Sequence, residues 1–250
     1  GSYEGTAGMI KKRKLVFEFQ NLLGNIITLF FGFAFAPMMA LVFGNSYANV
    51  PQALNQLYLG FFCTIPLSMV FVGFSSLFSQ EVEQGFTLRA ELFGYSRVSQ
   101  ALHKFMALTV FVLLSSIIYS WIFLSHFNLP LPNAVIIGQM AIFQILNTAV
   151  YFIIVFILTT ILKKFSRVYG ISMISYFAIM IISGIMGNMD VGKLGDYLPI
   201  KLFVTNYTNH LNDTDYISGK IGLYLLILLG ILGVILKVIV RNKNGNKHQY

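Results

Sequence analysis

Six long apolar stretches limit what this chain can fold into more than any other feature of its sequence. A helix needs ~20 mainly apolar residues to cross the ~30 Å hydrocarbon core of a bilayer. Each stretch is long enough to do so, and together they cover residues 22–43, 57–78, 105–124, 134–162, 168–187 and 219–240. The sequence therefore predicts an all-α membrane protein with six transmembrane helices.

Lys and Arg are distributed unevenly around these stretches. If each stretch crosses the membrane once, only Lys193, Lys201 and Lys220 of the 17 Lys and Arg lie on one side. The remaining basic residues share the other side: Lys11, Lys12, Arg13, Lys14, Arg89, Arg97, Lys104, Lys163, Lys164, Arg167, Lys237, Arg241, Lys243 and Lys247. Short loops rich in Lys and Arg stay in the cytoplasm. We therefore expect both termini to be cytoplasmic.

The composition favours a single membrane domain. Charged residues make up 10% of the chain, whereas about 25% of a typical soluble domain is charged. The loops leave no room for a second soluble domain, so residues 9–250 are interpreted as one transmembrane domain. Residues 1–8 are interpreted as an expression-tag remnant that precedes a natural start at Met9.

The segment from Met9 to Asn21 interleaves basic and apolar residues. Such a pattern is typical of a helix that lies along the cytoplasmic surface of a membrane. The net charge of +8 would suggest nucleic acid in a soluble protein, but basic residues on the cytoplasmic side account for it, with anionic lipid as their counterpart. We expect an N-terminal interfacial helix, a lipid membrane as partner and no nucleic acid.

No residue pattern predicts an enzyme. None of the 9 Asp and Glu falls near the middle of an apolar stretch, which argues against a proton- or sodium-driven carrier. No two His have the spacing of a metal motif, and residues 187–194 only imitate a phosphate-binding loop, because Leu194 lacks the hydroxyl group that would hold Mg²⁺. We expect no catalytic residue, no metal site and no ATP hydrolysis by this chain alone.

The segment 188–218 differs from the other loops because it mixes charged and apolar residues. The mixture predicts one or two short amphipathic helices at the extracellular face, before the last span. Two interpretations stay open. The segment is either an ordinary surface loop or an extracellular gate, whose apolar residues would be Leu194, Tyr197, Leu198 and Phe203.

The strongest chemical signal lies between the second and third apolar stretches, in residues 79–104. The charge density there far exceeds that of the flanking spans, and Leu88, Leu92 and Phe93 form one apolar edge at helical spacing. This pattern predicts a short amphipathic helix that projects into the cytosol and ends at a turn containing Gly94. An ordinary charged loop is the alternative.

The same segment resembles the coupling region of ABC-2 type transporter permeases. That region reads E-x-E-x-G-T, then a hydrophobic helix, P-x-S-R, and a Lys at the foot of the next span. Phe86 and Gly94 stand where the family commonly has Thr and Pro. The matching residues in this chain are Glu81, Glu83, Gly85, Ser96, Arg97 and Lys104.

The resemblance implies that a cytoplasmic coupling helix docks into a separate ATP-binding cassette ATPase. ATP and Mg²⁺ would be held by that partner, and this chain would carry no cofactor. Leu88, Leu92 and Phe93 would be the buried anchors of the contact. Charged side chains would pair around its rim, namely Glu81, Glu83, Arg89, Glu91 and Arg97. Two permease copies normally face each other, so a homodimer or a pair with a homologous chain is expected.

The expected cargo is hydrophobic or amphipathic. The chain contains 24 Phe and 10 Met, and flexible Met and flat aromatic side chains suit apolar cargo of variable shape. We expect an exporter of a peptide or drug in a bacterial cell membrane. Two other classes remain open: an ATPase-independent secondary carrier, and a non-transporting sensor or immunity protein whose cytoplasmic helix docks a different partner.

Overall fold

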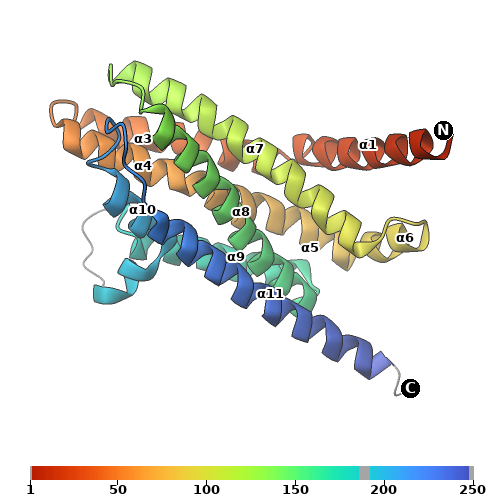
Figure 1. Cartoon of the computed structure of the whole chain (residues 1–250). Helices are drawn as coiled ribbons and strands as arrows, with labels where there is room; N and C mark the ends of the chain where they lie inside the picture. The colour runs from red at the N-terminus through yellow and green to blue at the C-terminus, as the bar shows by residue number, and fades with distance from the viewer. Residues whose placement is uncertain (1, 186–191, 248–250) are drawn as a thin grey trace.

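The computed structural model describes residues 2–185 and 192–247, and in these ranges all regular structure is helical (Figure 1). The elements follow one another as α1 (Ser2–Leu23), α2 (Ile26–Leu29), η1 (Phe30–Ala34), α3 (Phe35–Asn45), α4 (Pro51–Ser68), η2 (Met69–Phe74), α5 (Ser75–Glu83), α6 (Phe86–Leu92), α7 (Arg97–His126), α8 (Ala134–Leu162), α9 (Phe165–Ile182), η3 (Gly192–Tyr197), α10 (Pro199–Tyr207) and α11 (Gly219–Lys247).

Within the described residues, six helices are long and apolar enough to cross a membrane, which makes the chain a multi-pass membrane protein. They cover Ile26–Asn45, Pro51–Glu83, Arg97–His126, Ala134–Leu162, Phe165–Ile182 and Gly219–Gly245. The six predicted spans are thus confirmed as helices. The predicted end of the fifth span, at residue 187, lies outside the described residues.

The second and third spans are longer than predicted because their caps lie beyond the apolar run. Pro51 occupies the first turn of α4, where its missing N–H costs nothing. The Ser96 side chain caps α7 by accepting a hydrogen bond from Ser99 N at 3.2 Å. Both helices therefore begin before the apolar residues from which the spans were predicted.

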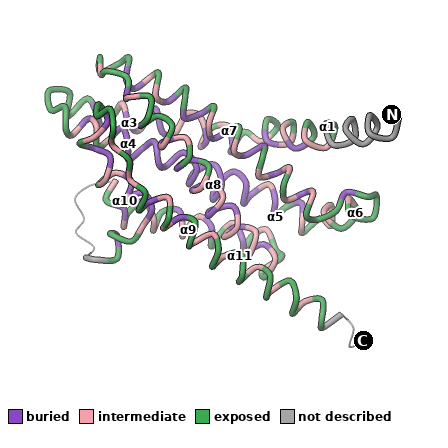
Figure 2. The backbone as a smooth tube through the Cα atoms, viewed as in Figure 1, coloured by how far each residue is buried: buried purple, intermediate pink, exposed green. Residues whose placement is uncertain are grey.

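The second span forms the centre of the bundle. Nearly all its residues from Tyr58 to Ser79 are buried, whereas α11 is exposed along most of its length (Figure 2). Fully buried side chains in this span include Phe61, Ile65, Leu67 and Phe71. The other spans pack around it and present apolar side chains outward, as expected of helices that lie in lipid.

The first two spans each contain a π-helical segment, and the two segments lie against each other. Gly32 in η1 contacts the side chain of Met69, and Gly73 in η2 contacts Thr28, so closely that an added Cβ atom would force the neighbouring residue to shift. Ser115 of α7 donates a hydrogen bond to the Gly32 carbonyl oxygen. These contacts hold the first three spans together at mid-bundle.

The two ends of the bundle differ. One end, here called the basic end, carries α1, α6, the turn between α8 and α9, and the C-terminal part of α11 (Figure 1). Glu83 at this end accepts a hydrogen bond from Phe165 N at 3.2 Å. The loops before α4 and α8, together with η3 and α10, lie at the opposite end. This arrangement is the one that six alternating crossings require.

Candidate functional site

A short helical hairpin at the basic end connects the second and third spans. Gly85 separates α5 from α6 with φ of 73°, a left-handed conformation that glycine adopts without steric cost. Gly94, with φ of 90°, follows the end of α6, and the chain then enters α7. The predicted short helix of residues 79–104 is therefore present as α6, and two glycines set its direction.

α6 is exposed on most sides (Figure 2). Leu88, Leu92 and Phe93 are 52%, 80% and 91% exposed. Exposed large apolar side chains that lie together commonly mark an interaction site. Leu88 and Leu92 are four residues apart and share one side of α6, whereas Phe93 lies on the side that faces α1.

The charged residues of the hairpin fall into two groups. Glu83, Arg89, Glu91 and Arg97 are exposed. Arg97 Nε lies 2.8 Å from Glu91 Oε2, and this ion pair connects α6 to the first turn of α7. Glu81 and Lys104 belong to the second group, since both are buried.

Lys104 lies between two buried carboxylates. Its Nζ atom is 2.9 Å from Glu18 Oε2 and 2.7 Å from Glu81 Oε2. Asn21 Nδ2 donates to Glu81 Oε1 at 2.6 Å, and the Tyr95 hydroxyl donates to Glu18 Oε1 at 3.0 Å. We call these five residues the Lys104 cluster. It joins α1, α5, α7 and the loop after α6 at one point.

The stability of the Lys104 cluster depends on each of its charged members. One ammonium group balances two carboxylates that are buried with it, and a buried charge left without its partner is strongly destabilising. Burial, and next the Glu18 carboxylate, raise the pKa of Tyr95. Tyr95 therefore keeps its proton and continues to donate to Glu18. The cluster is built as a rigid connection between α1 and the base of the hairpin.

The structure corrects one part of the predicted contact surface. Glu81 was expected at the rim of a partner contact, and Lys104 was assigned to the same coupling region, but both are directed inward. The reason is that Glu18 and Asn21, on a helix distant in sequence, supply their partners. The partner surface that remains consists of Leu88 and Leu92 with Glu83, Glu91 and Arg97. Two other residues predicted for it, Arg89 and Phe93, lie on the side of α6 that faces α1.

Glu18 was missed as a site residue. It is an acid in a segment that is otherwise basic and apolar, and it lies about one helical turn before the predicted first span. An isolated acid of this kind, in a protein with a Lys at the foot of a later span, is the signal that could have suggested the pair.

The predicted extracellular gate residues do not form one cluster. Leu194 and Tyr197 are exposed on η3, whereas Phe203 of α10 is buried. The Phe203 ring stacks on Phe143 with centroids 4.0 Å apart. Phe203 is thus a packing residue that holds α10 against α8. Leu198, partly buried, begins the turn into α10.

Neither metal-binding groups nor similarity to known proteins adds chemistry to this site. Among the described residues, no group of three or more His, Cys, Asp and Glu is arranged to hold a metal ion. Comparison of the chain with protein-family models, with curated proteins and with solved structures gave no match.

Proposed function

We propose that this chain is the membrane-spanning permease subunit of an ATP-binding cassette exporter in a bacterial cell membrane. In this proposal the basic end is cytoplasmic, α6 is the coupling helix, and a separate ATPase subunit binds ATP and Mg²⁺. The single observation that carries the proposal is α6 itself, a short helix that projects beyond the spans with exposed apolar side chains.

The apolar residues of α6 supply the affinity for the ATPase. A few large side chains that become buried at the centre of an interface carry most of its binding energy. Leu88 and Leu92 suit this role, because they are exposed and on one side of the helix. The exposed charges near them, such as Glu91 and Arg97, contribute mainly to orientation and association rate.

Movement of α6 would be transmitted to the spans through short, direct connections. α5 continues the second span without a break, and residues 93–96 join α6 to α7. The Lys104 cluster adds α1 to the same unit. A push on α6 from a closing ATPase would therefore displace the second and third spans together, and the central position of the second span would pass that displacement to the whole bundle.

The cargo in this proposal is a hydrophobic or amphipathic peptide or drug. A second copy of the chain, or a homologous chain, would complete the path across the membrane. The apolar outer surface of the spans supplies enough exposed side chains for both lipid and such a partner, for example on α9 and α11.

The first experiment asks whether an ATPase accompanies the chain. Purification from the native membrane is expected to yield a stoichiometric ATP-binding cassette protein. Leu92→Asp should then abolish the binding of that ATPase and the stimulation of ATP hydrolysis by cargo. Leu131→Asp is the matched control, because Leu131 is 71% exposed at the opposite end of the bundle. The proposal is wrong if no ATPase co-purifies or if Leu92→Asp keeps full stimulation.

A secondary carrier is the second candidate, and one observation favours it. Buried carboxylates in membrane helices are typical of proton-coupled carriers, and Glu81, in the last turn of the second span, is buried next to Lys104. Transport assays in vesicles without ATP distinguish the two functions. Uptake or efflux driven by a proton gradient, and lost in Glu81→Gln, would support the carrier.

A further inference from the structure

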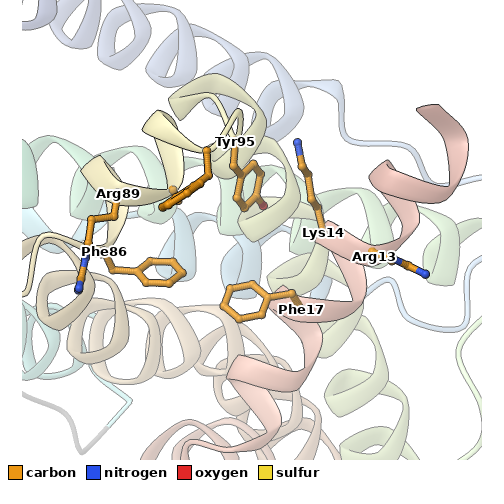
Figure 3. Close-up of a pocket in the computed structure, with 8 residues that line it drawn as sticks. Arg13, Lys14, Phe17, Phe86, Arg89 and Tyr95 are labelled. Carbon is orange, nitrogen blue, oxygen red and sulfur yellow. The ribbon is translucent and has the colours of Figure 1, made fainter. Parts of the chain in front are cut away.

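An open groove separates α1 from α6 at the basic end of the protein. Its volume is about 720 Å³, and four of its eight lining residues are aromatic (Figure 3). Phe17 of α1 and Phe86 of α6 point toward one another across it, with ring centroids 5.8 Å apart and nearly parallel planes. The groove therefore has an apolar floor that is accessible from outside.

Basic residues surround this floor. Arg13 and Arg89 lie at opposite ends of the groove, and Lys14 lies above the Tyr95 ring with Nζ 4.9 Å from its centroid (Figure 3). Lys14 also donates to the Gly94 carbonyl oxygen at 3.3 Å. No carboxylate in the described part of the chain forms an ion pair with any of these three side chains. The groove thus combines an aromatic floor with three positive charges that lack an acidic counterpart among those residues.

The side of α6 that lines the groove is not the side that carries Leu88 and Leu92. Phe86, Arg89 and Phe93 recur at intervals of three and four residues, so they form one stripe along the helix. That stripe faces α1. An occupant of the groove can therefore bind independently of a protein that contacts the Leu88 side.

From the position of the apolar run that follows Lys104, we infer that the groove lies near the layer where lipid headgroups begin. Tyr95 lines the groove and also donates to Glu18 in the Lys104 cluster. Lys104 immediately precedes the apolar run 105–124, which marks the edge of the hydrocarbon. The headgroup layer extends roughly 5–8 Å beyond that edge, and basic pockets between membrane helices at this depth bind acidic headgroups.

We propose that the α1–α6 groove binds an anionic phospholipid. The headgroup phosphate would lie beside Lys14, with Arg13 and Arg89 adding positive charge at the two ends of the groove. The glycerol and upper acyl region would lie on Phe17 and Phe86. A bound lipid would fill the space between α1 and α6 and so fix the position of α6. This proposal does not depend on the ATPase, because the groove, its charge and its depth are independent of what α6 contacts on its other side.

Site-specific fluorescence quenching tests the proposal in the full chain. The only Trp, Trp121, is 72% exposed and is replaced by Phe, and Phe17→Trp then places a reporter in the groove. The protein is reconstituted in phosphatidylcholine that contains a small fraction of spin-labelled phosphatidylglycerol or of spin-labelled phosphatidylcholine. We expect phosphatidylglycerol to quench the reporter at a clearly lower fraction than phosphatidylcholine. Each replacement of Arg13, Lys14 or Arg89 by Gln should reduce that preference about fivefold.

Two controls separate a binding site from the general attraction of a basic surface. Lys164→Gln, Arg167→Gln and Lys237→Gln together remove three exposed charges elsewhere at the basic end and should leave the preference unchanged. Leu88→Trp, in the chain without Trp121, places the reporter on the other side of α6 and should show no preference.

Three results would overturn the proposal. They are equal quenching by the two lipids, a preference that survives neutralisation of the groove, and an equal preference at position 88. If the two lipids quench equally, a protein partner becomes the alternative occupant of the groove.

Discussion

Lys104 Nζ lies 2.7 Å from Glu81 Oε2, and both side chains are buried at the basic end of the bundle. The contact joins the last turn of α5 to α7, on either side of the α6 hairpin. Glu18 of α1 completes the arrangement on the other side of Lys104. The two ends of the hairpin that carries the exposed helix α6 are thus held together by charges that are themselves buried.

Replacement of Lys104 tests this arrangement. Lys104→Met leaves two buried carboxylates without a cation, and we expect a loss of about 3–5 kcal/mol in the free energy of unfolding. The single Cys63 is buried, so its reaction with a thiol-specific fluorescent dye during heating reports unfolding. Lys201→Met is the control, because its ion pair with Asp196 is partly exposed and should cost at most about 1 kcal/mol. Similar losses in the two variants would contradict the prediction.

Neutralisation of the acids should rescue that variant in part. Glu18→Gln and Glu81→Gln, added to Lys104→Met, remove both unbalanced charges and keep the side-chain volumes. We expect the triple variant to unfold at a higher temperature than Lys104→Met alone. If the triple variant is less stable than the single one, charge imbalance is not what destabilises it.

Tyr95 contributes a hydrogen bond to a buried carboxylate. Tyr95→Phe removes the hydroxyl group that donates to Glu18 and should cost about 1.5–3 kcal/mol, the range for hydrogen bonds to charged groups. Tyr197→Phe, at an exposed ring, should have little effect. Thermal unfolding followed by circular dichroism compares the two variants.

The stabilisation by Tyr95 should also depend on pH. The pKa of Tyr95 is raised in the folded protein, so its contribution is complete below the ordinary tyrosine pKa of about 10 and falls as the pH rises above that value. The difference in melting temperature between the natural protein and Tyr95→Phe should therefore shrink above about pH 10. A difference that grows over the same range would contradict the assigned direction.

The contact between the first two spans predicts different costs at two glycines. A Cβ at Gly73 would meet the Oγ1 atom of Thr28 and also its Cα and Cβ atoms, whereas one at Gly32 would meet the flexible end of the Met69 side chain. Gly73→Ala should cost about 1–3 kcal/mol from overpacking, and Gly32→Ala should cost less. Gly230→Ala in α11 has open space around it and serves as the control. Equal melting temperatures for the first two variants would show that the backbone of the first span can move aside.

The six spans could be predicted because each requires only one long apolar run, which is a local property. The α6 hairpin was predictable for a similar reason, since its charges and glycines are adjacent in sequence. The pairing of Lys104 with Glu18 was not, because Glu18 lies 86 residues away and meets Lys104 only when α1 folds against α7. The burial of Phe203 was missed because an apolar residue in an amphipathic segment can face either a partner or the protein's own core.

The paired π-helical segments of the first two spans have a consequence for motion. A π turn contains one extra residue, so its displacement along a helix would turn the side chains it passes by about 100°. Gly32 and Gly73 each touch the opposite span at this level. Rotation within one of these spans is therefore obstructed unless the other rotates with it, which would make the pair a single rotating unit.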